Sequence, residues 1–384
     1  MEQKQTFLPL WCGIRHYAWG CRRHGSNQPY LATLLGQEAG DEPWAELWAG
    51  AHPSLSAKVI EGGCPGQELC RLVAEEPFAM LGPQWHDVGQ LPFLLKVLSC
   101  EQPLSIQCHP NLAQAKRLRV KHPDMYPDAW HKPEILVALT PFEMLVGLRP
   151  SEEIVSLLSA RPALQRWLKR GQGDPRRLVL VLSGLEPAEM AEITAGLEAE
   201  TGEVDELFRR LVTAFPGDRG ALFAYLMNHR VLQPGESQYV GAGTLHAYLQ
   251  GTGIECMANS DNVIRAGLTS KAVSWEDLLA VGDFKGLKTE PGQGIQSGTE
   301  TSYPVPMPEF ELRLLREGTH DLSDSAGRPG VLLVLSGEAE VSADGVVQTG
   351  GHGSAWFRPA CLKDSCVTLQ GAQALAAWAC AGRL

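Results

Sequence analysis

Three short motifs carry side chains of the kinds that bind metal ions. In Ser-Ile-Gln107-Cys-His109 an amide and an imidazole stand two residues apart, which places both on one face of a strand. Glu134, the last residue of His-Lys-Pro-Glu, enters an apolar run, where a carboxylate is costly unless it is paired or metal-bound. His246 follows the glycine-rich turn Gly-Ala-Gly-Thr at the expected start of another strand.

Together these four side chains form a nitrogen and oxygen ligand set. The lack of thiolates favours a catalytic metal over a structural one, and zinc fits this set whereas magnesium prefers oxygen ligands. Taken singly, the motifs also have plain structural interpretations. A buried histidine can be satisfied by one hydrogen bond, and Glu134 can form a surface pair with Lys132 or an arginine.

A fourth segment, from Glu255 to Lys271, mixes charged and amide residues with small ones and predicts a loop that lines a cleft. Within it, Arg265 and Lys271 are candidates for binding an anion, Arg265 through its planar guanidinium. The alternative is an Arg–Asp ion pair that only holds the loop in place.

The apolar runs 91–98 and 135–139 predict buried strands that would position these motifs, and 111–119 predicts a short helix. Residues 150–227 predict a helical block inserted into a strand-rich protein. Its signals are Ser151 as an N-cap, the stretch 187–200, and an apolar stripe at Val204, Leu207, Phe208, Leu211 and Phe215.

Strands are expected again from about Val231. The segment 284–308, rich in Gly, Ser, Thr and Pro, predicts a linker or long surface loop. Beyond it we expect a small antiparallel β-barrel or sandwich, with Ser336-Gly-Glu at a strand turn and a hairpin at Asp344-Gly345. The predicted division is 1–149 and 228–306 for the domain that carries these motifs, 150–227 for the insertion and 307–384 for the last domain.

Composition excludes several classes of protein. The 384 residues have a formal net charge of −11, so no overall field attracts nucleic acid or an anionic membrane. The ten cysteines include no C-x-x-C pair and are too dilute for a disulfide scaffold. No apolar stretch is long enough to span a membrane, and residues 1–20 lack the core of a signal peptide. We therefore expect a cytoplasmic, reduced protein.

Three long segments, 91–111, 131–150 and 243–271, resemble the type I phosphomannose isomerases, as do the shorter motifs around Trp19 and Glu46. The similarity covers nearly the whole chain in the family's order. It implies a mainly β protein: a cupin (jelly-roll) catalytic core, an inserted α-helical domain and a C-terminal cupin-like domain. It also implies one zinc ion on Gln107, His109, Glu134 and His246.

The same resemblance assigns the family's catalytic arginine to Arg265. It assigns the remaining pocket positions to Trp19, Lys96, Ser105, Lys132, Tyr248, Glu255, Asp261 and Lys271. Small departures are Cys108, Asn111, Trp130 and Ala18, of which the last two change the expected pocket wall.

The reaction implied is aldose–ketose isomerisation of a sugar phosphate, mannose 6-phosphate to fructose 6-phosphate, by a monomer. An enediolate intermediate needs a fixed cation, a role for Arg265, and a base, for which Glu255 and Lys132 are both candidates. The phosphate would be held by Ser105 with Lys96, or by Lys271. Alternatives are another cupin metalloenzyme, such as an epimerase or an iron-dependent dioxygenase, and a non-enzymatic metal- or sugar-binding cupin.

Overall fold

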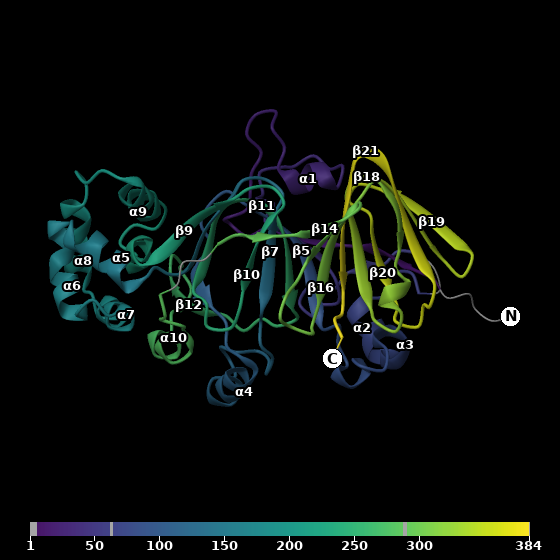
Figure 1. The fold of residues 1–384 in the computed structure, drawn as a ribbon, viewed down its shortest axis with the longest axis horizontal. Helices are drawn as coiled ribbons and strands as arrows, with labels where there is room; N and C mark the ends of the chain where they lie inside the picture. The colour runs from purple at the N-terminus through teal and green to yellow at the C-terminus, as the bar shows by residue number, and fades with distance from the viewer. Residues whose placement is uncertain (1–5, 62–63, 287–289, 384) are drawn as a thin grey trace.

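The computed structural model describes residues 6–61, 64–286 and 290–383. Two antiparallel sheets lie side by side, and a group of helices extends from the end of one of them (Figure 1). The protein is therefore mainly β with a helical insertion, as the sequence predicts. The first five residues of the stretch in which no signal peptide is expected lie outside the described part.

The first sheet carries the predicted site. Along its main path the strand order is β13-β10-β7-β11-β5-β3-β2. Strands β6 and β8 branch from β11, and they pair in turn with β12 and β9. Its strands are β2 (Gly13–Arg15), β3 (Glu46–Ala49), β5 (Phe93–Cys100), β6 (Ile106–Cys108), β7 (Glu134–Ala138), β8 (Phe142–Leu148), β9 (Met227–Leu232), β10 (Glu236–Val240), β11 (His246–Ala258), β12 (Ile264–Gly267) and β13 (Gly292–Gln293).

Strand β11 is the centre of this sheet. Its first residues pair with β6 and β8, and residues from Gly251 onward pair with β5 and β7. At the change of partners Gly251 has φ 128°, and a Cβ there would lie 2.7 Å from the carbonyl oxygen of Pro141. A glycine is therefore needed for β11 to serve both parts of the sheet.

The second sheet has the order β14-β15-β16-β21-β18-β20-β1-β4, with β17 and β19 attached. Its strands are β1 (Leu8–Trp11), β4 (Lys58–Val59), β14 (Ile295–Ser297), β15 (Glu300–Tyr303), β16 (Glu311–Arg316), β17 (Gly318–Asp321), β18 (Gly330–Ala343), β19 (Val346–Gly351), β20 (Ala355–Arg358) and β21 (Ser365–Cys380). Strands β1 and β4 come from the N-terminal part of the chain, so this sheet is not built from C-terminal residues alone.

One group of helices lies at the left end of the molecule, beyond β9, and the others lie above and below the sheets (Figure 1). The helices are α1 (Tyr30–Leu34), α2 (Leu69–Glu75), α3 (Pro77–Leu81), α4 (Leu112–Lys121), α5 (Ser151–Ser159), α6 (Gln165–Gly171), α7 (Pro175–Ser183), α8 (Pro187–Gly196), α9 (Glu203–Ala214) and α10 (Trp275–Val281), with 3₁₀ turns at His86–Val88, Pro162–Leu164, Arg219–Tyr225 and Ser323–Ser325. Among the described residues, no helix has the length and apolar character needed to cross a membrane.

Alternation along the strands decides what faces the core. One large cluster of buried residues joins both sheets and contains Phe93, Leu95 and Val97 of β5, Ile135 and Val137 of β7, and Ile254 and Cys256 of β11. The residues between them point to the opposite face of the sheet, because successive side chains alternate. These include Lys96, Glu134 and Glu255, so the strand pattern itself turns the charged residues toward one side.

Several local predictions are confirmed. The helical block of 150–227 contains α5–α9, and Leu207, Phe208 and Leu211 of the predicted stripe are buried. The short helix α4 follows the prediction, with Asn111 as its N-cap. The hairpin at Asp344 and Gly345 joins β18 to β19, and both residues have positive φ.

Four local predictions are wrong. The segment 255–271 is not one loop, because Glu255 lies in β11 and Arg265 in β12. The segment 284–308 contains the strands β13, β14 and β15, although 287–289 lie outside the described residues. Ser336-Gly-Glu is a bulge inside β18 rather than a turn between strands. Helix α5 has Pro150, not Ser151, at its N-cap.

Candidate metal centre and pocket

Three of the four predicted ligands meet at one buried point. Ligand atoms of His109, Glu134 and His246 all lie within 4.8 Å of one another, and the three residues are fully buried. Nε2 of His246 is 2.9 Å from Oε1 of Glu134, and Nε2 of His109 is 3.5 Å from Oε2 of the same carboxylate. They arrive from β7, from the start of β11 and from the residue after β6.

Both imidazoles are oriented through their other ring nitrogen. Nδ1 of His109 donates to the carbonyl oxygen of Asn262 at 2.8 Å, and Nδ1 of His246 donates to that of Thr244 at 3.0 Å. Each Nε2 lone pair therefore faces the cluster. Within the described part of the chain, Nε2 of His109 makes no hydrogen bond.

The pKa shifts of His109 and Glu134 favour the binding of a cation by the cluster. Burial, together with the charge of Lys132, lowers the pKa of His109 to about 4, so its imidazole is neutral at physiological pH. Burial by itself would raise the pKa of Glu134, but Lys132 and the two histidines outweigh it and hold that pKa well below its usual range. Two imidazoles and a carboxylate, with one orphaned buried nitrogen, fit a divalent metal ion.

Gln107, the fourth predicted ligand, lies beside the cluster. It is the cross-strand partner of His246, and its Nε2 is 3.3 Å from Nε2 of that histidine. Turning the amide by 180° puts its oxygen in the same place. Cys108, between Gln107 and His109, points the other way into a hydrophobic cluster, as strand alternation predicts.

A second group of charges lies next to the ligands. Nζ of Lys96 is 3.1 Å from Oε2 of Glu255 and 3.8 Å from Oε2 of Glu46, and all three side chains are buried. Trp48 donates its indole N–H to Glu46 at 2.6 Å, and Nζ of Lys96 lies 4.9 Å from the centre of that indole ring. Burial would lower the pKa of Lys96, but the two carboxylates outweigh it and raise that pKa.

Lys132 and Tyr248 hold the carboxylate of Glu134 in the cluster. Lys132 donates a hydrogen bond to Glu134, and the hydroxyl of Tyr248 donates to the same carboxylate at 3.3 Å. The Glu134–Lys132 pair suggested by the sequence is thus real, but it is buried rather than at the surface.

The charges open into one pocket of about 570 Å³. All predicted pocket residues line it: Trp19, Lys96, Ser105, Gln107, Lys132, Tyr248, Glu255, Asp261, Arg265 and Lys271. Sequence reasoning missed further lining residues: Tyr17, Glu46, Trp48 and Phe215. Glu46 and Trp48 stand in a matched motif, and a glutamate at the start of an apolar strand is the signal that could have found them.

The two candidate anion-binding residues both line the pocket, and neither forms an ion pair in the ranges that the structure describes. Arg265 is the cross-strand partner of Gln107, and within the described residues it forms no ion pair, so the alternative of an Arg–Asp pair does not hold. Burial lowers the pKa of Arg265. Lys271 lies at the pocket over Tyr17, with Nζ 6.0 Å from the ring centre. Asp261 instead contacts His52, with Oδ2 3.4 Å from Nε2.

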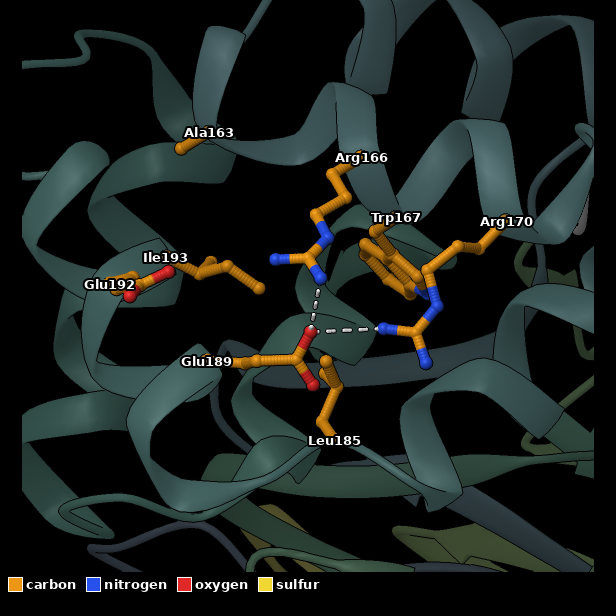
Figure 2. A pocket seen from close by; sticks show the side chains of 8 residues that line it. All are labelled: Ala163, Arg166, Trp167, Arg170, Leu185, Glu189, Glu192 and Ile193. Atoms are coloured by element: carbon orange, nitrogen blue, oxygen red, sulfur yellow. Dashed lines mark hydrogen bonds and ion pairs between the residues drawn. The ribbon is translucent and has the colours of Figure 1, made fainter.

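A smaller hollow of about 170 Å³ lies in the helical insertion (Figure 2). Its floor contains Trp167, and one carboxylate oxygen of Glu189 faces both Arg166, at 3.6 Å, and Arg170, at 3.1 Å. Glu189 lies between the two arginines, so their charges are already paired.

A buried histidine–glutamate–histidine cluster in an antiparallel sheet, next to a pocket of charged residues, defines a metal-site protein of cupin-like fold. Residues 7–151 match the family described as phosphomannose isomerase type I, catalytic domain. Mannose-6-phosphate isomerase from Homo sapiens is 36% identical over an alignment of 344 residues, and the match covers 79% of this chain and 81% of that protein. The Escherichia coli (strain K12) enzyme of the same name is 36% identical over an alignment of 359 residues, and the match covers 85% of this chain and 88% of that one.

Solved structures agree along the whole length. A mutant of phosphomannose isomerase from Salmonella typhimurium is similar with a TM-score of 0.88 and 30% identity, covering 99% of this chain and 100% of that one. A zinc-bound mannose 6-phosphate isomerase gives a TM-score of 0.86 at the same identity and coverage. The chain belongs to the type I phosphomannose isomerase family.

Proposed function

We propose that this protein interconverts mannose 6-phosphate and fructose 6-phosphate with one zinc ion per chain. The observation that carries the proposal is the buried cluster of His109, Glu134 and His246. Its direct neighbours Gln107, Lys132 and Tyr248 line a pocket of about 570 Å³ that also contains separate cations. The names of its relatives support the substrate, and a zinc-bound relative supports the metal.

His109, Glu134, His246 and Gln107 would hold the zinc. When bound, a divalent cation supplies Lewis acidity that stabilises negative charge on the substrate oxygens. The protein's own part is to fix the ligands: Asn262 and Thr244 hold the imidazoles, and Lys132 and Tyr248 hold the carboxylate.

Proton transfer between the two sugar carbons requires a base within hydrogen-bond reach. Glu255 and Lys132 both line the pocket. The ammonium group of Lys132 already donates to Glu134, which places it to give a proton rather than to take one. We assign proton removal to the carboxylate of Glu255, held by Lys96 at 3.1 Å.

The phosphate of the substrate needs charge-assisted donors. Lys96 lies between two carboxylates, whereas Lys271 forms no ion pair within the described residues. We assign the phosphate to Lys271 and Ser105. Arg265, opposite Gln107 on β12, is nearer the metal ligands in the sheet and is assigned to the charge that develops on the reacting oxygens.

The test is conversion of mannose 6-phosphate and fructose 6-phosphate in both directions, with the products identified by NMR. Activity should disappear after treatment with a chelator and return with zinc. An epimerised aldose phosphate as the product would assign the site to the epimerase alternative. Binding of the sugar phosphate without turnover by the zinc-loaded protein would defeat the proposal and leave a binding protein.

We also propose that the chain acts as a cytoplasmic monomer. All ten cysteines are free thiols, which suits a reducing compartment. Light scattering on the zinc-loaded protein should give a mass near 41.8 kDa, and twice that mass would contradict the proposed monomer. Cell fractionation tests the location, and a secreted pool of the protein would contradict it.

A further inference from the structure

The carboxylate of Asp128 joins two separate parts of the site. One oxygen accepts from the backbone N–H of Trp130 at 2.8 Å, the hydroxyl of Ser260 at 2.9 Å and the amide of Asn262 at 2.9 Å. The other oxygen accepts from the backbone N–H of Asp261 at 3.0 Å. Three of these four donors belong to the connection between β11 and β12, whereas Asp128 itself lies in the segment that leads into β7.

Asn262 passes this contact on to a metal-ligand candidate. It is fully buried, and its amide also donates to the carbonyl oxygens of Asp128 at 3.0 Å and Trp130 at 2.8 Å. The backbone carbonyl oxygen of Asn262 accepts the Nδ1–H of His109 at 2.8 Å. The position of that carbonyl sets both the tautomer and the ring orientation of His109.

We propose that Asp128 is a positioning residue for the metal centre, which it orients through Asn262 and His109; this inference rests on the proposed zinc site. With Asp128 in place, the β11–β12 connection is fixed to the segment that carries Lys132 and Glu134. Without its carboxylate, several donors, including the buried Asn262 amide, lose an acceptor, and the loss of such partners favours rearrangement of the connection.

The experiment measures zinc affinity of the full chain by competition with a chelator, with no substrate present. Asp128→Asn keeps the shape of the side chain but turns one of its two acceptor oxygens into a donor. Whichever way the amide is oriented, the donors that met that oxygen lose their acceptor: either the backbone N–H of Asp261 or the other three. We expect the zinc dissociation constant to rise about 10–100-fold, the size typical of losing an outer partner of a ligand. The visible absorption bands of the cobalt-loaded protein should shift as well, because the geometry of His109 changes.

Two matched controls separate positioning from stability. Asp124→Asn removes an exposed carboxylate from the same segment and should leave zinc affinity unchanged. Asp205→Asn removes a buried, ion-paired carboxylate in the helical insertion, so it should lower thermal stability without changing zinc affinity. Should Asp128→Asn not fold, Ser260→Ala removes one donor to the same oxygen and should weaken zinc binding about 2–10-fold.

The inference is overturned if Asp128→Asn, or Ser260→Ala in its place, binds zinc within twofold of the wild type. It is equally overturned if Asp205→Asn weakens zinc binding as much. Because zinc affinity is measured without substrate, a wild-type protein that binds zinc but isomerises nothing would defeat the proposed function alone.

Discussion

Lys96 and Glu255 are direct partners on the neighbouring strands β5 and β11, and their charged atoms lie 3.1 Å apart. Glu46 approaches the same ammonium group at 3.8 Å from the other side. One buried cation thus separates two buried carboxylates. Burial raises the pKa of Glu46, and the charge of Lys96 opposes that rise.

Lys96→Met should move the acidic limb of kcat/KM to higher pH. Without the ammonium group, the two carboxylates are like charges in one buried site and retain a proton between them at higher pH. Since we assign proton removal to ionised Glu255, activity then appears only at higher pH. Measuring kcat/KM against pH checks this, with exposed Lys58→Met as the control. An acidic limb at the same pH as in the wild type would show that Lys96 does not control the ionisation on which activity depends.

His109→Ala and His246→Ala should each lose most of the bound zinc and essentially all activity. Each change removes one fully buried ligand atom from the cluster. Metal analysis after dialysis measures the zinc content, and His24→Ala, an exposed histidine, serves as the control. Full stoichiometric zinc in both variants would show that the ligands are wrongly assigned.

Cys108→Ala should retain its zinc, although Cys108 stands between two ligand candidates. Its side chain is buried on the opposite face, and burial raises the pKa of its thiol to about 12. The thiolate that binds metals is therefore not formed at neutral pH. We expect unchanged metal content and a loss of about 1 kcal/mol in the free energy of unfolding; loss of zinc would contradict the strand geometry.

The placement of the candidate metal ligands could be predicted in part from the sequence because strand alternation is local, whereas the resemblance to the family implied the full set of four. Gln107 and His109 share a face, Cys108 takes the other, and a carboxylate in the apolar run after Pro133 signals a special site. The same rule explains why Lys96 points to the pocket while its neighbours in β5 enter the core.

Other features depend on contacts between distant segments. The pairing of β1 with β20 brings Pro9 opposite Trp356, and no local pattern encodes that register. Strands β13, β14 and β15 are two to four residues long and lie among glycine and threonine, so their composition resembles a loop. The roles of Glu46 and Asp128 follow only from partners on other elements.

The ion pair between Arg161 and Asp205 in the helical insertion should contribute to the free energy of unfolding in a pH-dependent way. Burial would raise the pKa of Asp205, but hydrogen bonds from Arg161 and Tyr225 outweigh it and lower that pKa. A carboxyl with a lowered folded-state pKa stabilises the fold above its unfolded pKa of about 3.9, and this contribution is lost as pH falls through the folded value.

Asp205→Asn should therefore cost about 3–5 kcal/mol of unfolding free energy at pH 7, because it leaves Arg161 buried without its partner. The difference from wild type should shrink at pH 3. Denaturant titrations at the two pH values measure it, with exposed Glu152→Gln as the control. An equal difference at both pH values would show that the charge of Asp205 is not the source.

Substitutions of Arg265 and Lys271 should affect different kinetic constants, although both residues are cations of one pocket. Arg265 lies on β12 opposite Gln107, where a fixed guanidinium stabilises the enediolate more than the neutral carbonyl of the ground state. Arg265→Ala should lower kcat about 10²–10³-fold with little change in KM. Lys271→Ala, which removes a phosphate donor used equally in both states, should mainly raise KM. Steady-state kinetics on the zinc-loaded variants decides it: if Arg265→Ala raises KM and leaves kcat unchanged, Arg265 binds the substrate instead.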